Sequence, residues 1–220
     1  MELKVPRTFI TLVAVFITSL VTANVLATKL FAFSGFILPA GVVAYPITFL
    51  MTDVIGEIWG KKVVTRVVWA GFFCSILAMS LGFLAVLLPA APFYERQEFF
   101  AELFGRVGRI TGASLIAYLV SQLNDVWVFH KLKEYTNGKH LWLRNNVGTI
   151  TSQFFDTVIF IVIAFYGIMP ASVLLSMILS QWVIKILIAL VDTPFCYWLV
   201  AWCKRRNGMI RLSTSVTKEW

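Results

Sequence analysis

Six long apolar runs constrain this chain more than any other feature of its sequence. Each run is near or above the ~20 residues that a helix needs to cross the hydrocarbon core of a bilayer. Because 59% of the 220 residues are hydrophobic and only 14% are charged, a soluble domain of this size could not bury the apolar surface. The sequence therefore predicts an all-α integral membrane protein, folded as a single polytopic domain over residues 1–220. The six expected transmembrane helices cover about residues 9–30, 36–59, 63–88, 110–129, 147–168 and 173–202.

The basic residues are divided unequally between the two sides that six spans would create. One side holds both termini, the second loop and the fourth loop. It carries Lys4, Arg7, Lys61, Lys62, Arg66, Lys131, Lys133, Lys139, Arg144, Lys204, Arg205, Arg206, Arg211 and Lys218. The other side carries Lys29, Arg96, Arg106 and Arg109. The positive-inside rule then predicts that both termini are cytoplasmic. Since the basic residues lie between apolar runs, the net charge of +8 reflects membrane topology, and we expect no nucleic-acid partner.

The longest outer connection, residues 89–109, has the pattern of an amphipathic helix. Phe100, Leu103, Phe104 and Val107 follow the i, i+3, i+4, i+7 spacing, and charged residues occupy the other face. We expect a helix that lies on the outer leaflet. The alternative is that this segment acts as an outer gate.

A short pattern occurs twice, in two successive apolar runs. Residues 121–129 and 152–160 both read Ser-Gln-x-x-Asp-x-x-x-Phe. Gln and Asp three positions apart lie on the same side of a helix. A carboxylate at membrane depth is costly unless it faces protein or a water-filled cavity, so the two copies predict a polar pocket between helices. Together with a weak echo of the pattern in the second span, they leave open two inverted three-helix halves.

Further polar residues map to a similar depth and come from other spans. The candidate binding residues are Asn24, Asp53, Glu57, Gln122, Asp125, Gln153, Asp156, Lys185 and Asp192. Purely structural interpretations compete with binding at three of them. Glu57 can extend to water and meet Lys61, Lys185 can pair with one carboxylate and hold two helices together, and Asn24 can hydrogen-bond a neighbouring helix.

The chemistry of this set favours a small polar ligand. Four buried aspartates face one ammonium group, so they cannot all stay ionised and unpaired: either some are protonated, or a ligand supplies donors. Carboxylates with Asn and Gln suit a purine-like edge, which offers adjacent N–H donors and a carbonyl acceptor. Aromatic residues near the same depth could stack on a flat ring: Tyr45, Phe129, Phe154, Phe160 and Trp182. The sequence thus predicts a site for a small heteroaromatic compound.

No motif in the chain indicates catalysis. The sequence lacks His-Glu-x-x-His, Gly-x-Ser-x-Gly and a Walker loop. Cys74, Cys196 and Cys203 have neither metal-ligand spacing nor a disulfide framework. We therefore expect a protein that is not an enzyme and needs no metal or cofactor.

Several of these motifs together resemble those of the bacterial queuosine precursor transporter family, also called the vitamin uptake transporter family. The resemblance covers nearly the whole chain. It rests on Pro46…Asp53-Val54-x-x-Glu57-x-x-Gly60, on both Ser-Gln-x-x-Asp blocks, on Lys185 and on Asp192-Thr193-Pro194. It implies import of a deazaguanine precursor of queuosine, such as 7-cyano-7-deazaguanine or its aminomethyl relative, across the bacterial cytoplasmic (inner) membrane. The resemblance also places Gln122, Asp125, Gln153, Asp156 and Lys185 on the polar positions of the family.

Three hypotheses follow from the sequence. The first is a self-sufficient transporter of a queuosine precursor, used in salvage for tRNA modification. The second is a membrane substrate-binding subunit of an ATP-driven vitamin-type uptake complex. The third is a structural or ion-conducting membrane protein, which predicts no saturable binding of purine-like compounds. Whether the chain forms a homodimer in the bilayer is left open.

Overall fold

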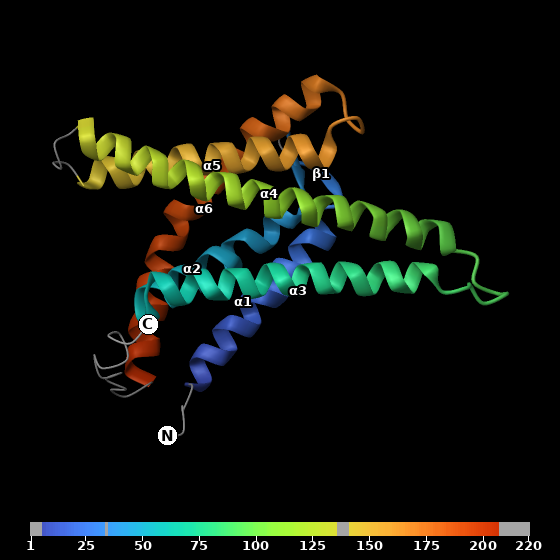
Figure 1. Cartoon of the computed structure of the whole chain (residues 1–220), viewed down its shortest axis with the longest axis horizontal. Helices are drawn as coiled ribbons and strands as arrows, with labels where there is room; N and C mark the ends of the chain where they lie inside the picture. Colours follow the sequence, from blue (N-terminus) through green and yellow to red (C-terminus); the bar gives the residue numbers. More distant parts are fainter. Residues whose placement is uncertain (1–5, 34, 136–140, 207–220) are drawn as a thin grey trace.

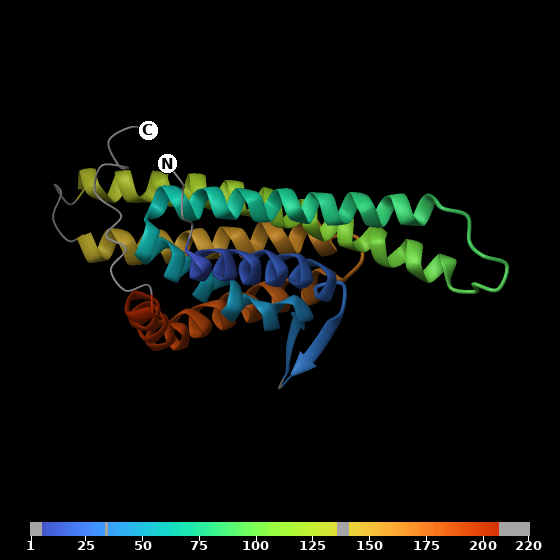
Figure 2. The ribbon, with the colours of Figure 1, turned by 90° about the horizontal axis from the view of Figure 1, so that it is seen from below.

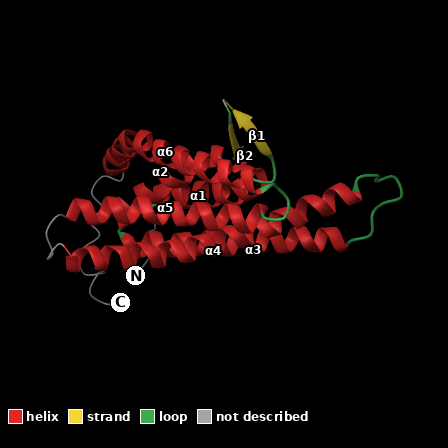
Figure 3. Ribbon diagram, turned by 90° about the horizontal axis from the view of Figure 1, so that it is seen from above, coloured by secondary structure: helices red, strands yellow, loops and turns green. Residues whose placement is uncertain are grey.

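The protein is an all-α multi-pass membrane protein with one short hairpin. The computed structural model describes residues 6–33, 35–135 and 141–206. The described elements are α1 (Arg7–Leu26), β1 (Leu30–Phe33), β2 (Phe36–Pro39), the 3-10 helix η1 (Ala40–Ala44), α2 (Tyr45–Trp59), α3 (Lys61–Leu87), α4 (Gln97–Tyr135), α5 (Leu141–Phe165) and α6 (Ala171–Arg206). Figure 1 shows α4 between α3 and α5, with α1 and α2 crossing behind. Figure 3 shows the two strands standing beside an otherwise helical chain.

Five helical stretches in the described part of the chain are long and apolar enough to cross a membrane. They are Arg7–Leu26, Ala40–Trp59, Lys61–Leu87, Gln97–Ser121 and Ala171–Ile188. In α5 the described apolar stretch, Ile150–Phe165, is shorter. A count of six spans therefore stays a prediction, as does the arrangement in two inverted halves.

The two ends of the bundle differ in what lies there. At one end the ring of Phe9, early in α1, lies 5.0 Å from that of Trp59, the last residue of α2. Cys203 of α6 packs in the same core cluster as Leu12 of α1. We call this the Gly60 end, after the residue that links α2 to α3. The opposite end holds the α3–α4 connection, the hairpin and the α5–α6 connection, and we call it the hairpin end (Figure 2).

The hairpin is a departure from the expected helices. The predicted spans 9–30 and 36–59 would have placed residues 27–30 and 36–44 in α-helix, whereas the chain there forms an antiparallel pair with Leu30 opposite Pro39 and Phe33 opposite Phe36. Gly35, in the turn between the two strands, adopts a φ of +85°, a left-handed conformation that glycine reaches without a steric penalty. The α-helix resumes at Tyr45, where a proline in the first turn is well tolerated.

The prediction of a separate helix on the outer leaflet is wrong. Gln97 begins α4, which continues without a break to Tyr135, well beyond the predicted span 110–129. The ring of Phe104 lies directly against Gly82 of α3, and Phe83 packs beside Gly108. The apolar stripe thus packs against α3, which extends far enough to cover it in part: Val107 is buried and the other three side chains are half-buried.

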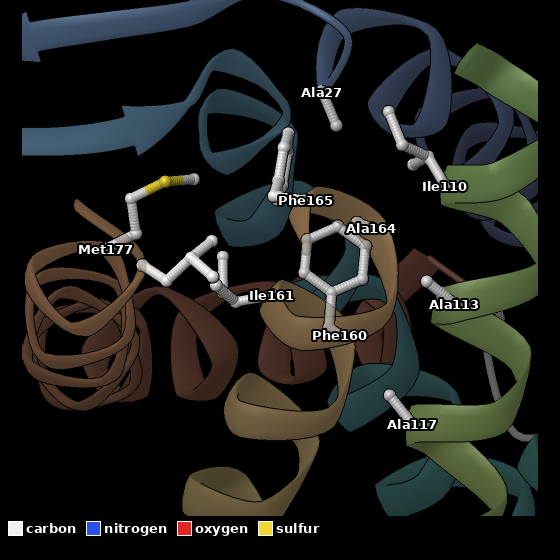
Figure 4. Packing of buried hydrophobic residues seen from close by; sticks show 10 residues of the cluster. Ala27, Ile110, Ala113, Ala117, Phe160, Ile161, Ala164, Phe165 and Met177 are labelled. Carbon is white, nitrogen blue, oxygen red and sulfur yellow. The ribbon is translucent and has the colours of Figure 1, made fainter. Parts of the chain in front are cut away.

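A buried apolar cluster lies toward the hairpin end. It consists of Ala27, Ile110, Ala113, Ala117, Phe160, Ile161, Ala164, Phe165, Leu174 and Met177. In Figure 4 the small side chains of Ala113 and Ala117 on α4 face Phe160 of α5. Small residues let helix backbones approach closely, so this end of the bundle is tightly packed.

Candidate binding cavity

One large cavity lies between the helices. Its volume is about 1270 Å³ and side chains from all six α-helices line it. Six of the nine candidate residues are among the lining side chains: Asn24, Asp53, Glu57, Gln153, Asp156 and Lys185. The side chains of the other three, Gln122, Asp125 and Asp192, lie outside the described residues. The fold therefore brings together polar groups that α1, α2, α5 and α6 carry far apart in sequence.

Exposure changes along the cavity. Asn24 and Lys185 are buried, with 7% and 5% of their surface exposed. Asp53, Glu57 and Lys61 are exposed, and the latter two flank the turn at Gly60. The cavity thus opens toward the Gly60 end, and its deep end lies around Asn24 and Lys185. Because small-molecule pockets usually measure about 300–1,000 Å³, this volume holds an access path as well as a site.

The repeated Ser-Gln pattern reaches this cavity from two helices. Ser121 on α4 and Ser152 on α5 are both buried, and both line it. Gln153, next to Ser152, also lines it, and its Oε1 has no hydrogen-bond partner among the described residues. Buried polar atoms are normally satisfied by protein, water or ligand, so this oxygen is available to an N–H donor.

An ion pair occupies the deep part of the cavity. Nζ of Lys185 on α6 donates a hydrogen bond of 2.6 Å to Oδ2 of Asp156 on α5. The contact is the one expected if Lys185 joins two helices, and the same pair also lines the cavity. A paired ammonium and carboxylate present both donors and an acceptor to whatever enters.

Two further residues complete the deep site: Tyr45, which was expected only to stack on a flat ring, and Gln181, which was not assigned to binding. Nε2 of Gln181 donates to the Tyr45 hydroxyl at 2.9 Å, and Lys185 Nζ lies 5.3 Å from the Tyr45 ring centroid. The spacing of four between Gln181 and Lys185 was the available signal, since it puts both on one face of α6. Nothing in the sequence indicated that this face would meet the first residue of α2.

The aromatic residues expected to stack divide into two groups. Tyr45 and Phe160 line the cavity, and Phe49, which was not predicted, stacks on Tyr45 with centroids 6.0 Å apart. Phe154 and Trp182 instead pack edge to face against each other, 5.4 Å apart, and are not among the cavity-lining residues. Phe129 carries a side chain outside the described residues.

The sequence was then compared with known proteins. The family described as "Putative vitamin uptake transporter" matches residues 39–199. The chain belongs to this family. The match confirms the family that the motifs resemble, and it spans α2 and nearly all of α6, including the Lys185–Asp156 pair. Asn24 on α1 lies outside the matched residues.

Three bacterial proteins with curated names are also similar to this chain. A "Probable queuosine precursor transporter" of Bacillus subtilis is 35% identical over 180 residues, covering 80% of this chain and 78% of the relative. The "Queuosine precursor transporter" of Escherichia coli is 29% identical over 132 residues, covering 60% and 57%. A "Probable queuosine precursor transporter" of Haemophilus influenzae is 31% identical over 128 residues, covering 57% and 51%. No solved structure matches the chain.

Proposed function

We propose that this protein imports a deazaguanine precursor of queuosine, 7-cyano-7-deazaguanine or a related compound, across the bacterial cytoplasmic membrane. The observation that carries the proposal is the Lys185–Asp156 pair at the deep end of a cavity between helices. The names of the relatives supply the class of compound. Neither source is sufficient alone, because the cavity would suit several heteroaromatic compounds.

The deep site matches the hydrogen-bonding edge of a guanine-like ring. Its N1–H and 2-amino groups are adjacent donors, which a carboxylate such as that of Asp156 accepts side by side. The neighbouring C6 carbonyl is an acceptor, and Lys185 lies within 2.6 Å of the same carboxylate to donate to it. Phe49 and Phe160, which also line the cavity, offer flat surfaces on which the bicyclic ring can stack.

The direction in which the cavity opens supports release toward the cytoplasm. Lys61, at its open end, belongs to the side that is rich in Lys and Arg, which the positive-inside rule assigns to the cytoplasm. We therefore propose that both termini are cytoplasmic and that the cavity, as it stands, faces inward. A cysteine accessibility experiment tests this orientation, with Cys74, Cys196 and Cys203 first replaced by alanine.

In that background Lys61→Cys and Glu95→Cys place one thiol at each end of the bundle. A membrane-impermeant thiol reagent added to intact cells should label Glu95→Cys and should reach Lys61→Cys only after permeabilisation. The reverse pattern would show that the cavity opens outward in this conformation and that the proposed topology is inverted.

Uptake by the purified chain tests the transport activity. Liposomes that contain this protein and no other should take up radiolabelled 7-cyano-7-deazaguanine in a saturable manner. Asp156→Asn should abolish uptake, because an amide of equal size replaces one of the two acceptor oxygens with a donor, and loss of a buried charged hydrogen bond reduces affinity by about 1.5 to 3.5 decades. Glu98→Gln makes the same change on α4, outside the cavity, and should transport like the wild type.

Three results would refute the proposal. One is uptake that does not saturate. Another is wild-type transport by Asp156→Asn. The third is uptake that requires an added ATP-hydrolysing partner, which would favour a substrate-binding subunit instead.

A further inference from the structure

Tyr45 sits where α2 meets α6 in the deep part of the cavity. It is the first residue of α2, it lines the cavity, and Phe49 one turn later stacks on its ring with an interplanar angle of 25°. The Lys185 ammonium lies 5.3 Å from the ring centroid. The ring is thus held by α2 on one side and by α6 on the other, so the position of its hydroxyl group is well defined.

Gln181 holds that hydroxyl group from behind. The side chain of Gln181 is fully buried, it is not among the cavity-lining residues, and its Nε2 donates to Tyr45 Oη at 2.9 Å. A phenol can accept and donate at once. With the Tyr45 oxygen accepting from Gln181 Nε2, the O–H hydrogen remains to be donated, and no hydrogen bond from it is found among the described residues, where the buried Oε1 of the same amide is also without a partner. The deep site therefore holds a donor whose direction a second residue fixes.

We propose that Tyr45 recognises the substituent at position 7 of the bound deazaguanine and that Gln181 positions the Tyr45 hydroxyl group. This inference rests on the proposed function. The groups follow one another as Asp156, Lys185 and Tyr45, with Lys185 Nζ 2.6 Å from the carboxylate and 5.3 Å from the ring. Around the edge of a deazaguanine the corresponding order is the N1–H and 2-amino donors, the C6 carbonyl and the 7-substituent. A ligand whose N1–H and 2-amino groups donate to Asp156, and whose C6 carbonyl accepts from Lys185, therefore brings its 7-substituent to Tyr45.

This arrangement distinguishes between two precursors. The nitrile of 7-cyano-7-deazaguanine is an uncharged acceptor, so it can receive the Tyr45 O–H. The aminomethyl group is cationic and carries donors, and Lys185 lies beside the same ring, so two positive charges would be brought together. The deep site thus favours the nitrile over both the aminomethyl group and an unsubstituted position 7.

Binding of three ligands to the purified full-length protein tests the inference. The ligands are 7-deazaguanine, its 7-cyano derivative and its 7-aminomethyl derivative, and their affinities are measured by calorimetry. The wild type should bind the cyano compound about three- to tenfold more tightly than 7-deazaguanine, the value of one neutral hydrogen bond. Tyr45→Phe should bring this ratio close to one while leaving the affinity for 7-deazaguanine within about twofold.

Variants of the positioning residue complete the design. Gln181→Met keeps the length of the side chain. Like Tyr45→Phe, it should lower the ratio of the affinity for the 7-cyano compound to that for 7-deazaguanine. The double variant should fall no further than Tyr45→Phe alone, because both changes act on one hydrogen bond. Tyr166→Phe, which removes a hydroxyl outside the cavity, should keep the wild-type ratio.

The outcomes separate this inference from the proposed function. Wild-type protein that binds no deazaguanine would overturn both. Wild-type protein that binds all three compounds equally would overturn only the role of Tyr45, and this comparison requires no variant. The same conclusion follows if Tyr45→Phe weakens all three ligands by one factor, since Tyr45 would then support the fold or the ring and not the 7-substituent.

Discussion

Nζ of Lys185 on α6 lies 2.6 Å from Oδ2 of Asp156 on α5, so a single ion pair links two helices and also lines the cavity. The two partners are not equally buried. The Lys185 side chain is 5% exposed and that of Asp156 is 25% exposed. Removal of either partner therefore has a different consequence for the charge that is left behind.

The first prediction follows from this asymmetry. Asp156→Asn leaves the more buried ammonium without its partner and should destabilise the protein by about 3–5 kcal/mol, the usual cost of breaking a buried pair. Lys185→Met should cost less, because Asp156 still reaches the cavity. The double variant carries no buried charge at this place and should recover most of the stability. Thermal unfolding in detergent, followed by tryptophan fluorescence, measures all three.

Uptake separates the two roles of the pair. If both groups contact the ligand, the stable double variant should still fail to transport. Recovery of transport together with stability would show that the pair only holds α5 and α6 together.

The sequence predicted part of this site and could not predict the rest, for reasons that particular residues make clear. Membrane depth is readable from position in an apolar run, so Asp156 and Lys185 were both identified as facing a polar interior. Their pairing depends on how α5 and α6 are rotated against each other, which no local pattern encodes. The contact of Gln181 with Tyr45 spans 136 residues and was missed for the same reason.

The errors in the predicted helix boundaries had a local cause. Residues 30–39 are apolar enough to extend a spanning helix, and hydropathy alone outweighed the Ser34-Gly35 turn signal between two short apolar segments. The stripe in α4 was correctly identified as a helix face, but a single sequence cannot tell whether lipid or α3 covers such a face.

The second prediction concerns the close packing of η1 on α1. A Cβ atom added at Gly41 would lie 2.6 Å from the backbone oxygen of Ala23 and 3.1 Å from Cβ of Ala27. Because the backbone of α1 cannot yield as a side chain does, Gly41→Ala should push η1 away and cost about 1–3 kcal/mol.

Gly105→Ala provides the matched control. Gly105 lies within α4, and an added Cβ would meet nothing within 4 Å. The better helix propensity of alanine should then raise stability by up to about 1 kcal/mol. Gly41→Ala should lower the midpoint temperature of unfolding and Gly105→Ala should raise it. A Gly41→Ala variant with unchanged stability would contradict the packing of η1 on α1.

The third prediction concerns Arg109, which closes the C-terminal end of α5. Its Nε donates to the carbonyl of Ile163 at 2.7 Å and its Nη2 to that of Tyr166 at 2.5 Å. The last carbonyls of a helix lack partners within the helix, and a cation there also favours the helix dipole. Arg109→Ala should therefore cost about 1.5 kcal/mol, and Arg109→Lys should recover only part of it because lysine lacks the forked donor.

Arg106 supplies the comparison on the same helix. It pairs with Glu102 one turn earlier, and both side chains are exposed. Such pairs contribute about 0.3–0.5 kcal/mol, so Arg106→Ala should shift thermal unfolding far less than Arg109→Ala. Equal shifts would mean that the contacts with α5 contribute little.

The fourth prediction locates the ligand along the cavity. Thr48 is buried and lines the cavity one helical turn after Tyr45, whereas Cys196 lines it eleven residues beyond Lys185 on α6. At 1.5 Å per residue, Cys196 lies roughly 16 Å from Lys185 along the helix, nearer the Gly60 end. Two single-cysteine proteins, one with Thr48→Cys and one with the native Cys196, therefore report on the deep end and on the path to it.

Alkylation rates with and without 7-cyano-7-deazaguanine give the answer. At ten times the dissociation constant, only about one cavity in eleven is unoccupied, so alkylation at position 48 should slow by about tenfold. Cys196 should react at close to its original rate, because a bicyclic ligand fills a small part of a cavity of about 1270 Å³. Equal protection of both thiols would place the ligand between Cys196 and the Gly60 end, among Asp53 and Glu57. Protection of neither would show that the compound does not enter this cavity, even if it is transported.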